Sequence, residues 1–167
     1  IMNSGCYGYD ISKVLISLKV IDINVAQERE IKREELEFYY RGTSLSENLI
    51  ITSVKLRGRV DSKDKIEKLQ NELIKKKKLS QPSQIKTCGS TFKNKIPGKQ
   101  AWQLIKEAGC DKFKEGDAII SQKHSNFFVN NGKAKSADIE RLIYRVKEAV
   151  SKKIGIDLEL EIKIIGE

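Results

Sequence analysis

The chain has 167 residues, of which 39% are hydrophobic and 33% are charged, a balance typical of a globular protein rather than a disordered one. No apolar run approaches the roughly 20 residues of a transmembrane helix, and the first residues carry no signal-peptide pattern. The net charge of +9 comes from 25 Lys and 7 Arg spread along the sequence, with one run at 75–78 and no aromatic residues within it, so we do not expect a nucleic-acid partner.

Two β-branched, apolar segments at 14–22 and 49–56 predict strands in the first half of the chain. Between them, residues 33–40 favour a short helical turn. Apolar residues at helical spacing, after an Asp-Ser pair suited to capping, predict a helix over 62–78. The polar, Pro-containing segment 80–84 ends that pattern, and we therefore place a domain boundary after residue 80.

A Gly-Ser segment at 87–94 begins the second half, and we expect it to be a loop between two helical patterns. Pro97-Gly98 is expected to open a helix with one apolar face, and Gly109 to close it as a left-handed cap. The apolar positions of this helix are Ala101, Leu104, Ile105 and Ala108.

Short strands are predicted at 118–121 and 127–130, followed by a turn at Asn131-Gly132. Ser136 is expected to cap a long helix with apolar residues at helical spacing. Residues 158–164 alternate apolar and charged side chains, which predicts a final strand.

These elements predict an α+β fold in two unequal domains, 1–80 and 81–167. Cys6, Cys88 and Cys110 are an odd number at wide spacing, and the chain has a single His. A zinc site needs more closely paired ligands, and a disulfide framework needs an even number of cysteines. We therefore expect three reduced cysteines and no metal site.

The Gly-Ser segment presents groups suited to an anionic ligand. Gly89 permits a backbone conformation, or a close approach, that a side chain would block. Ser90 offers a hydroxyl, while Lys93 and Asn94 offer a cation and an amide for phosphate or carboxylate oxygens. An ordinary polar turn accounts for the same residues and is the more common outcome.

Three further residues are open to two interpretations. A lone His such as His124 is more often structural than a ligand or a base. Arg41, which follows two tyrosines, is either an exposed cation or a bidentate clamp for a carboxylate. Glu161 shares the polar face of the predicted last strand with Glu159, and periodicity does not separate the two carboxylates.

Four motifs nevertheless follow one another in a fixed order, after the opening Met2-Asn3-Ser4-Gly5-Cys6-Tyr7-Gly8. They are Tyr40-Arg41, Gly89-Ser90-x-Phe92-Lys93-Asn94, Ser121-x-Lys123-His124-x-Asn126-Phe127 and Glu161-Ile162-x-Ile164-Ile165-Gly166. Together they resemble the bacterial UDP-N-acetylenolpyruvoylglucosamine reductase family over nearly the whole chain. The likeness is to its shorter form, because the Tyr-containing insertion of the longer form has no counterpart between Arg41 and Ser90.

The resemblance implies an oxidoreductase in which NADPH reduces FAD and hydride passes to C3 of the enolpyruvyl group of UDP-N-acetylglucosamine enolpyruvate. A serine then protonates C2 to give UDP-N-acetylmuramate for peptidoglycan. Ser90 matches that proton donor, and Glu161 and Arg41 match the residues that stabilise the developing charge. The positions that match substrate contacts are Tyr40, Lys93, Asn94 and His124, and those assigned to the cofactor are Asn3, Gly5 and Gly8.

The resemblance further implies that 1–80 is the C-terminal part of a flavin-binding domain and 81–167 a substrate-binding domain. It implies a cytoplasmic enzyme that is a monomer when complete. The Gly-rich FAD loop of the family has no counterpart after Ile1, so we expect the N-terminal FAD half to be missing from this sequence. Two rival hypotheses therefore stay open, namely a non-catalytic UDP-sugar-binding fragment and a basic nucleic-acid-binding module.

Overall fold

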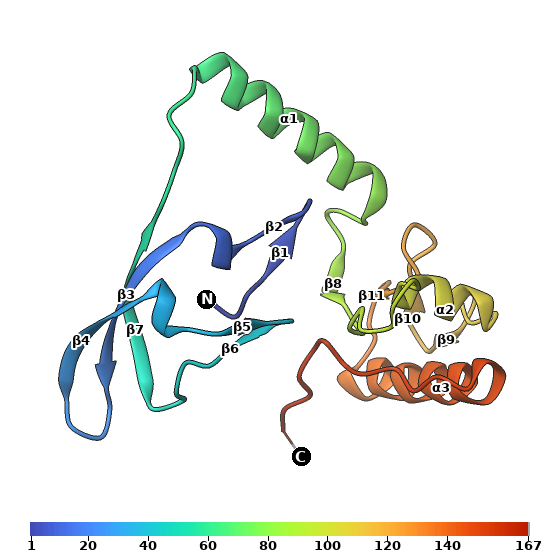
Figure 1. Ribbon diagram of the computed structural model, residues 1–167. Coiled ribbons are helices and arrows are strands. Elements are labelled where there is room, and N and C mark those ends of the chain that lie inside the picture. Colours follow the sequence, from blue (N-terminus) through green and yellow to red (C-terminus); the bar gives the residue numbers. More distant parts are fainter. Residues whose placement is uncertain (167) are drawn as a thin grey trace. The chain divides into compact units, whose positions relative to one another are not determined.

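The computed structural model describes residues 1–166 and contains two compact units, Ile1–Lys63 and Asp64–Glu167 (Figure 1). Helices and antiparallel sheets occur together, so the predicted α+β class is confirmed. The two units divide after Lys63, so nearly all of helix α1 (Lys63–Ser80) belongs to the second unit. The functional domain boundary expected after residue 80 stays a prediction. Within residues 1–166, no helix is long and apolar enough to cross a membrane.

The first unit is built on a three-stranded antiparallel sheet in the order β4-β3-β7. The central strand β3 (Leu15–Asp22) and the edge strand β7 (Leu49–Leu56) confirm the predictions for 14–22 and 49–56. The other edge, β4 (Gln27–Lys32), was not predicted, because Ile31 is its only apolar residue. Leu18 is fully buried in a small core and pairs with Ile31 on β4. The buried members of this core are Leu15, Leu18, Val20, Ile31 and Leu36.

Short elements surround this sheet. They are β1 (Gly5–Cys6), β2 (Tyr9–Asp10), β5 (Phe38–Tyr39), β6 (Gly42–Thr43) and the 3₁₀ helices η1 (Ile11–Lys13) and η2 (Arg33–Glu35). The helical turn predicted for 33–40 is therefore wrong beyond residue 35. The chain becomes extended at Leu36, which is buried in the core, and residues 38–39 pair with 42–43 in a two-residue hairpin.

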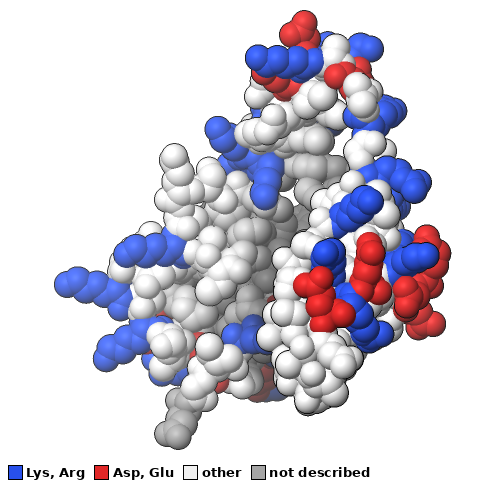
Figure 2. All heavy atoms as spheres, turned by 90° about the vertical axis from the view of Figure 1, so that its left-hand side faces the viewer, with Lys and Arg blue, Asp and Glu red and all other residues white. Residues whose placement is uncertain are grey.

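Charge is dispersed over the outer edge of this sheet. Along β4, the exposed residues Glu28, Arg29, Glu30 and Lys32 alternate in sign, and Lys19 Nζ lies 3.4 Å from Glu28 Oε1. Figure 2 shows Lys and Arg side chains standing singly or mixed with acidic ones on the face it draws.

The second unit contains a four-stranded antiparallel sheet in the order β8-β11-β10-β9, packed with two helices. The strands are β8 (Lys86–Ser90), β9 (Lys114–Glu115), β10 (Ala118–Ile120) and β11 (Phe127–Asn130), and the helices are α2 (Ala101–Glu107) and α3 (Ser136–Ile154). Fourteen buried residues form their common core, which includes Phe92, Leu104, Ile105, Phe128 and Leu142. The predicted apolar faces of both helices are thus confirmed, whereas α1 buries none of its residues.

The ends of the two core helices follow from local chemistry. Gly109, with φ of 77°, ends α2 as predicted, while Cys110 N donates to Ile105 O (3.0 Å) in a Schellman motif. The predicted start of α2 at Pro97-Gly98 is wrong, because these residues form a turn and the helix begins at Ala101. Ser136 is likewise not the cap of α3 but its first residue. The Asp138 carboxylate instead accepts the N–H of Lys135 (2.8 Å), which precedes the helix.

Two predictions about strands are wrong. The Gly-Ser segment, expected as a loop, forms the edge strand β8 and continues into the bridge between Phe92 and Leu160. The final strand expected at 158–164 is reduced to that one bridge, since Leu158 is buried but Ile164 is 45% exposed. The apolar residues alternate as far as Ile164, but the apolar core does not reach that residue, so the segment does not continue as a strand.

Candidate active site

Ser90 is the last residue of β8, where the strand passes toward the buried Phe92. It pairs with Phe127 of β11, and the next residue, Thr91, donates its N–H to Asn126 O (2.8 Å). The Asn126 side chain is 1% exposed; it accepts the N–H of Phe92 (2.9 Å) and donates to Phe92 O (2.8 Å). The backbone on the C-terminal side of Ser90 is therefore fixed by a buried amide.

The Ser90 side chain is half-buried. Within residues 1–166 its hydroxyl makes no hydrogen bond, so it is available to a ligand. Asn126 is the functional residue that sequence reasoning missed, although it lies inside one of the quoted motifs. An amide in a polar turn gives no sign from sequence that it is buried against a distant strand.

The C-terminal segment places Glu161 beside this strand end. Glu161 N donates to Thr91 O (2.9 Å), and Lys93 N donates to Glu159 O (2.8 Å), on the two sides of the Phe92–Leu160 bridge. Glu161 is half-buried, whereas the Glu159 side chain is 51% exposed. The two carboxylates that periodicity left equivalent thus lie in different surroundings.

Glu159 is held by two lysines. Its carboxylate oxygens lie 2.5 Å from Lys95 Nζ and 3.0 Å from Lys93 Nζ. The hydrogen bonds from Lys95 and from Lys93 lower the pKa of the Glu159 carboxyl, which is ionised at neutral pH. This carboxylate therefore serves as a counter-ion to the lysines that follow Ser90.

Asn94 and His124, both predicted to contact substrate, each lie beside the first turn of α2. Asn94 Oδ1 accepts the N–H of Ala101 (2.9 Å) at the first residue of that helix. The ring of the next residue, Trp102, lies 6.3 Å from the His124 ring. The first two residues of α2 therefore contact both residues that were predicted to bind substrate.

His124 lines a pocket of about 440 Å³ together with Trp102, Lys106 and Lys123. Its Nδ1 accepts the N–H of Asn126 (3.3 Å), which makes Nε2 the protonated nitrogen of the neutral ring. Burial lowers the pKa of His124 below its ordinary value of 6.5. The pocket thus combines flat aromatic surface, a neutral imidazole donor and two lysines with one carboxylate, Asp111, and its net positive charge suits a planar ring attached to phosphate.

The first unit gathers the remaining predicted residues around a separate pocket of about 390 Å³. Asn3, Gly5, Gly8, Tyr40 and Arg41 all line it. The Arg41 guanidinium lies 4.9 Å from the centre of the Tyr40 ring. Asn3 and Arg41 have φ values of 52° and 55°, a left-handed conformation that is uncommon for residues other than glycine and is concentrated at functional sites.

The same pocket has an unsatisfied polar atom. Asn3 donates through Nδ2 to Tyr39 O (2.9 Å), but its buried Oδ1 has no hydrogen-bond partner within residues 1–166. Buried polar atoms are nearly always paired, so this oxygen fits a donor supplied by a ligand. Gly5 keeps the β1–β2 hairpin closely paired, since a Cβ there would lie 3.2 Å from Tyr9 O, and Gly8 has φ of 80° with open space where a side chain would stand. Asn3, Gly5 and Gly8 could therefore hold part of a cofactor.

The predicted site residues thus fall into two groups. The second unit contains Ser90, Lys93, Asn94, His124 and Glu161. The first unit contains Asn3, Gly5, Gly8, Tyr40 and Arg41.

Comparison with known proteins gives a consistent result. The sequence profile of the UDP-N-acetylenolpyruvoylglucosamine reductase C-terminal domain matches residues 81–165. The UDP-N-acetylenolpyruvoylglucosamine reductases of Pelagibacter ubique and Gluconobacter oxydans are 45% and 41% identical to the chain, covering 98% and 99% of it. The chain covers 55% and 53% of those relatives, so it spans about half of their length.

A solved structure is similar over the same extent. The crystal structure of UDP-N-acetylenolpyruvylglucosamine reductase from Thermus caldophilus aligns with a TM-score of 0.81 and 33% sequence identity. The alignment covers 97% of this chain and 57% of that one.

Proposed function

Because the chain belongs to the UDP-N-acetylenolpyruvoylglucosamine reductase family, we propose that it takes part in reducing UDP-N-acetylglucosamine enolpyruvate to UDP-N-acetylmuramate. This is an oxidoreductase step of peptidoglycan synthesis, and we place it in the cytoplasm, in a protein that is a monomer when complete. FAD, once reduced by NADPH, would supply the hydride. Asn3, Gly5 and Gly8 would hold FAD, as the open hydrogen-bonding position of Asn3 Oδ1 favours.

Ser90 is the proton donor in this proposal. A hydroxyl is a weak acid, so it donates a proton usefully only when it is fixed in position and the charge left behind is stabilised. The observation that carries the assignment is the hydroxyl's lack of a hydrogen bond to residues 1–166, next to a backbone locked by Asn126. The Ser90 hydroxyl is therefore attached to a fixed backbone, and no hydrogen bond to the described residues competes with its donation to substrate.

Glu161 and Arg41 are assigned to the charge that develops at the enolpyruvyl carboxylate and C2. Arg41 suits the carboxylate, because a guanidinium can donate two parallel hydrogen bonds to it. Glu161 is favoured over Glu159, since it matches the family motif and is half-buried beside the strand end that carries Ser90. Tyr40, Lys93, Asn94 and His124 would contact the rest of the substrate, and the aromatic and cationic pocket of His124 favours its nucleotide part.

The test is Ser90→Ala in the full polypeptide to which these residues belong. Substrate reduction should fall about 10²–10⁴-fold, the usual contribution of a positioned proton donor. The reduction of flavin by NADPH, followed by loss of flavin absorbance, should be unchanged. Ser83→Ala, at an exposed serine outside the site, is the matched control and should keep both rates. Normal turnover in Ser90→Ala would show that the donor is another group.

A second candidate function follows from one observation. The pocket of His124, with its aromatic surface and two lysines, also fits a UDP-sugar-binding role without oxidoreductase activity. Titrating FAD and UDP-N-acetylglucosamine separately into purified protein distinguishes the two functions. Protein that binds the sugar nucleotide but stays colourless with added FAD supports the binding role.

A further inference from the structure

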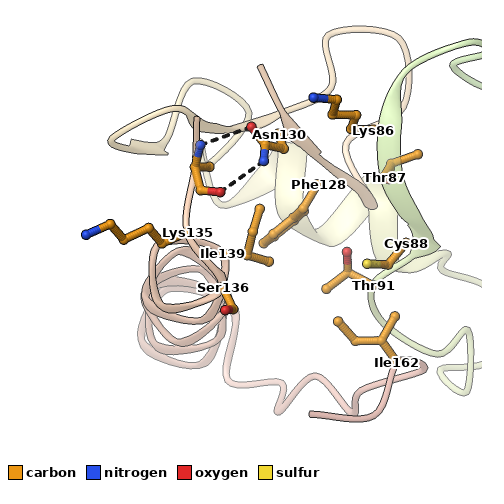
Figure 3. Close-up of a pocket in the computed structure, with 11 residues that line it drawn as sticks. Lys86, Thr87, Cys88, Thr91, Phe128, Asn130, Lys135, Ser136, Ile139 and Ile162 are labelled. Atoms are coloured by element: carbon orange, nitrogen blue, oxygen red, sulfur yellow. Dashed lines mark hydrogen bonds between the residues drawn. The ribbon is translucent and has the colours of Figure 1, made fainter. Parts of the chain in front are cut away.

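A different pocket of about 430 Å³ lies between strands β8 and β11, the beginning of α3 and the C-terminal segment (Figure 3). Phe128, Ile139 and Ile162 give it an apolar interior. Pockets of this size that are largely apolar, with a few polar groups, are typical of small-molecule sites. It shares no lining residue with the His124 pocket, and the proposed reaction makes no use of it.

Thr91 supplies the pocket with an unused polar group. The residue is 2% exposed, yet it lines the pocket, and Figure 3 draws its side chain among Cys88, Ile139 and Ile162. Its hydroxyl makes no hydrogen bond to any of residues 1–166. The oxygen is not among the fully buried unpaired atoms, so it reaches the open space of the pocket and can pair with a ligand group there.

The polar edge of the pocket favours a negative charge. Lys86 and Lys135 lie on it, both exposed, and none of the described residues that line it is acidic. The beginning of the 19-residue helix α3 adds a partial positive charge on the same side. The nearest carboxylate of that helix, Asp138, is engaged by the N–H of Lys135 and by Arg141.

The walls of the pocket are held by the Asn130 side chain. Its Oδ1 accepts the N–H groups of Gly132 and Ala134 (3.0 Å each), and its Nδ2 donates to Ala134 O (2.9 Å). The dashed lines in Figure 3 mark the two bonds to Ala134. This amide fixes the turn that leads into α3, so the pocket is preformed rather than opened by loop movement.

We propose that this pocket binds a small amphipathic anion, with an aromatic or branched apolar body against Phe128 and Ile139. Its single carboxylate, sulfonate or phosphate would lie at the edge that Lys86 and Lys135 line, and a polar atom of its body would pair with the Thr91 hydroxyl deeper in the pocket. This proposal is independent of the proposed reaction. Its physical consequence is that a bound ligand touches β8 at Cys88 and Thr91, on both sides of Ser90.

Cys88 provides a local readout, because its thiol is exposed and lines the pocket. Cys110 is fully buried, and burial raises the pKa of its thiol, so it reacts slowly. Cys6 is exposed, and Cys6→Ser leaves Cys88 as the accessible thiol. Alkylation of Cys88 by iodoacetamide, in which the thiolate forms the S–C bond and iodide leaves, then reports on the pocket alone.

The experiment measures the rate of Cys88 alkylation in the full polypeptide carrying Cys6→Ser, by peptide mass spectrometry. The probe is 8-anilinonaphthalene-1-sulfonate. By mass action, a probe concentration of about ten times its Kd should slow alkylation about tenfold. Lys135→Ala should weaken that protection about two- to fivefold, the effect of one exposed charge, and Lys112→Ala, which removes a charge away from the pocket, should not.

Thr91→Val tests the hydroxyl at nearly constant shape. It should weaken protection about two- to tenfold, the effect of one neutral hydrogen bond. An alkylation rate that the probe leaves unchanged, while probe fluorescence rises, would place the probe elsewhere and overturn the proposal. So would a Cys88 that is unreactive in the full polypeptide without probe, because another segment would then fill the pocket.

Discussion

Ser90 and Arg41 are held in place by different physical means. Around Ser90, the neighbours Thr91, Phe92 and Asn126 are 2%, 0% and 1% exposed, and the backbone is tied by hydrogen bonds across the sheet. The core beneath them has fourteen buried residues. Buried side chains and the hydrogen bonds of Asn126 to Phe92 together therefore fix this part of the site without a ligand.

Arg41 lies in a unit with five buried core residues, in a two-residue turn with a left-handed backbone. Among the described residues, the only fully buried side-chain atoms without a hydrogen-bond partner, Asn3 Oδ1 and Thr43 Oγ1, are in this unit. The fully buried polar side-chain atoms described in the second unit are thus paired without a ligand, whereas the first unit has two that a ligand could pair. We expect the first unit to be the less stable and the one that gains more from cofactor.

The largest expected effect is loss of core packing in one unit at a time. Leu142→Ala should lower the free energy of unfolding of the second unit by about 2–5 kcal/mol, because a buried leucine leaves a cavity. Leu18→Ala should do the same in the first unit. Native-state hydrogen exchange of amides in α3 and β3 measures each. Leu69→Ala, at a 58% exposed position, is the control and should change stability by less than about 0.5 kcal/mol.

If either core variant lowers the hydrogen-exchange protection of both units equally, the two cores unfold together. That result would contradict the comparison.

The next effect separates the two carboxylates beside Ser90. Glu161→Gln should lower kcat/KM for substrate reduction about 10²–10³-fold, as loss of a group that stabilises transition-state charge does. Glu159→Gln should have a far smaller effect, because its carboxylate pairs with Lys93 and Lys95. Steady-state kinetics of both variants in the full polypeptide make the measurement. Equal losses would mean that the lysine pair, rather than Glu161 alone, supports the chemistry.

A smaller effect is expected where the Ser90 segment is tied to β11. Asn126→Ala leaves the Phe92 N–H and C=O buried without their partners, which should cost about 1–3 kcal/mol of stability. Asn131→Ala is the matched control, because Asn131 is exposed and lies just after the other end of β11. Denaturant titrations compare the two. If Asn126→Ala is as stable as its control, Ser90 is positioned by the strand pairing instead.

The elements that could be predicted from sequence are those whose own residues carry the pattern. The helix α3 and the strand β7 were placed closely, because apolar periodicity and β-branched residues act locally. The strand β4 escaped prediction, since a charged edge strand has a single apolar residue to mark it. The segment β8 was taken for a loop because its polar residues pair with β11, which lies 37 or more residues further on.

The same limit applies to the site. The sequence motifs that resemble the family pointed to Ser90, Arg41 and His124. Each of these side chains belongs to a short motif, and the motifs occur in the order found in the family. The Lys95–Glu159 pair and the Asn126 bonds to Phe92 join residues far apart in the chain, so no spacing rule reveals them. The pocket lined by Thr91 was not predicted either, because a threonine beside Phe92 shows from sequence neither its burial nor the cavity next to it.

The smallest expected effect is a pH dependence confined to the second unit. Burial lowers the pKa of His124 in the folded state, so the unfolded state binds its proton first as pH falls below 6.5. Stability of this unit should therefore be constant above that pH and decrease as pH falls from about 6.5 to 5.5, a range above the ordinary carboxylate pKa values. The charged residues that line its pocket are Lys106, Lys123 and Asp111. Thermal unfolding of His124→Gln should lose this slope, and a slope that persists would assign the titration to another group.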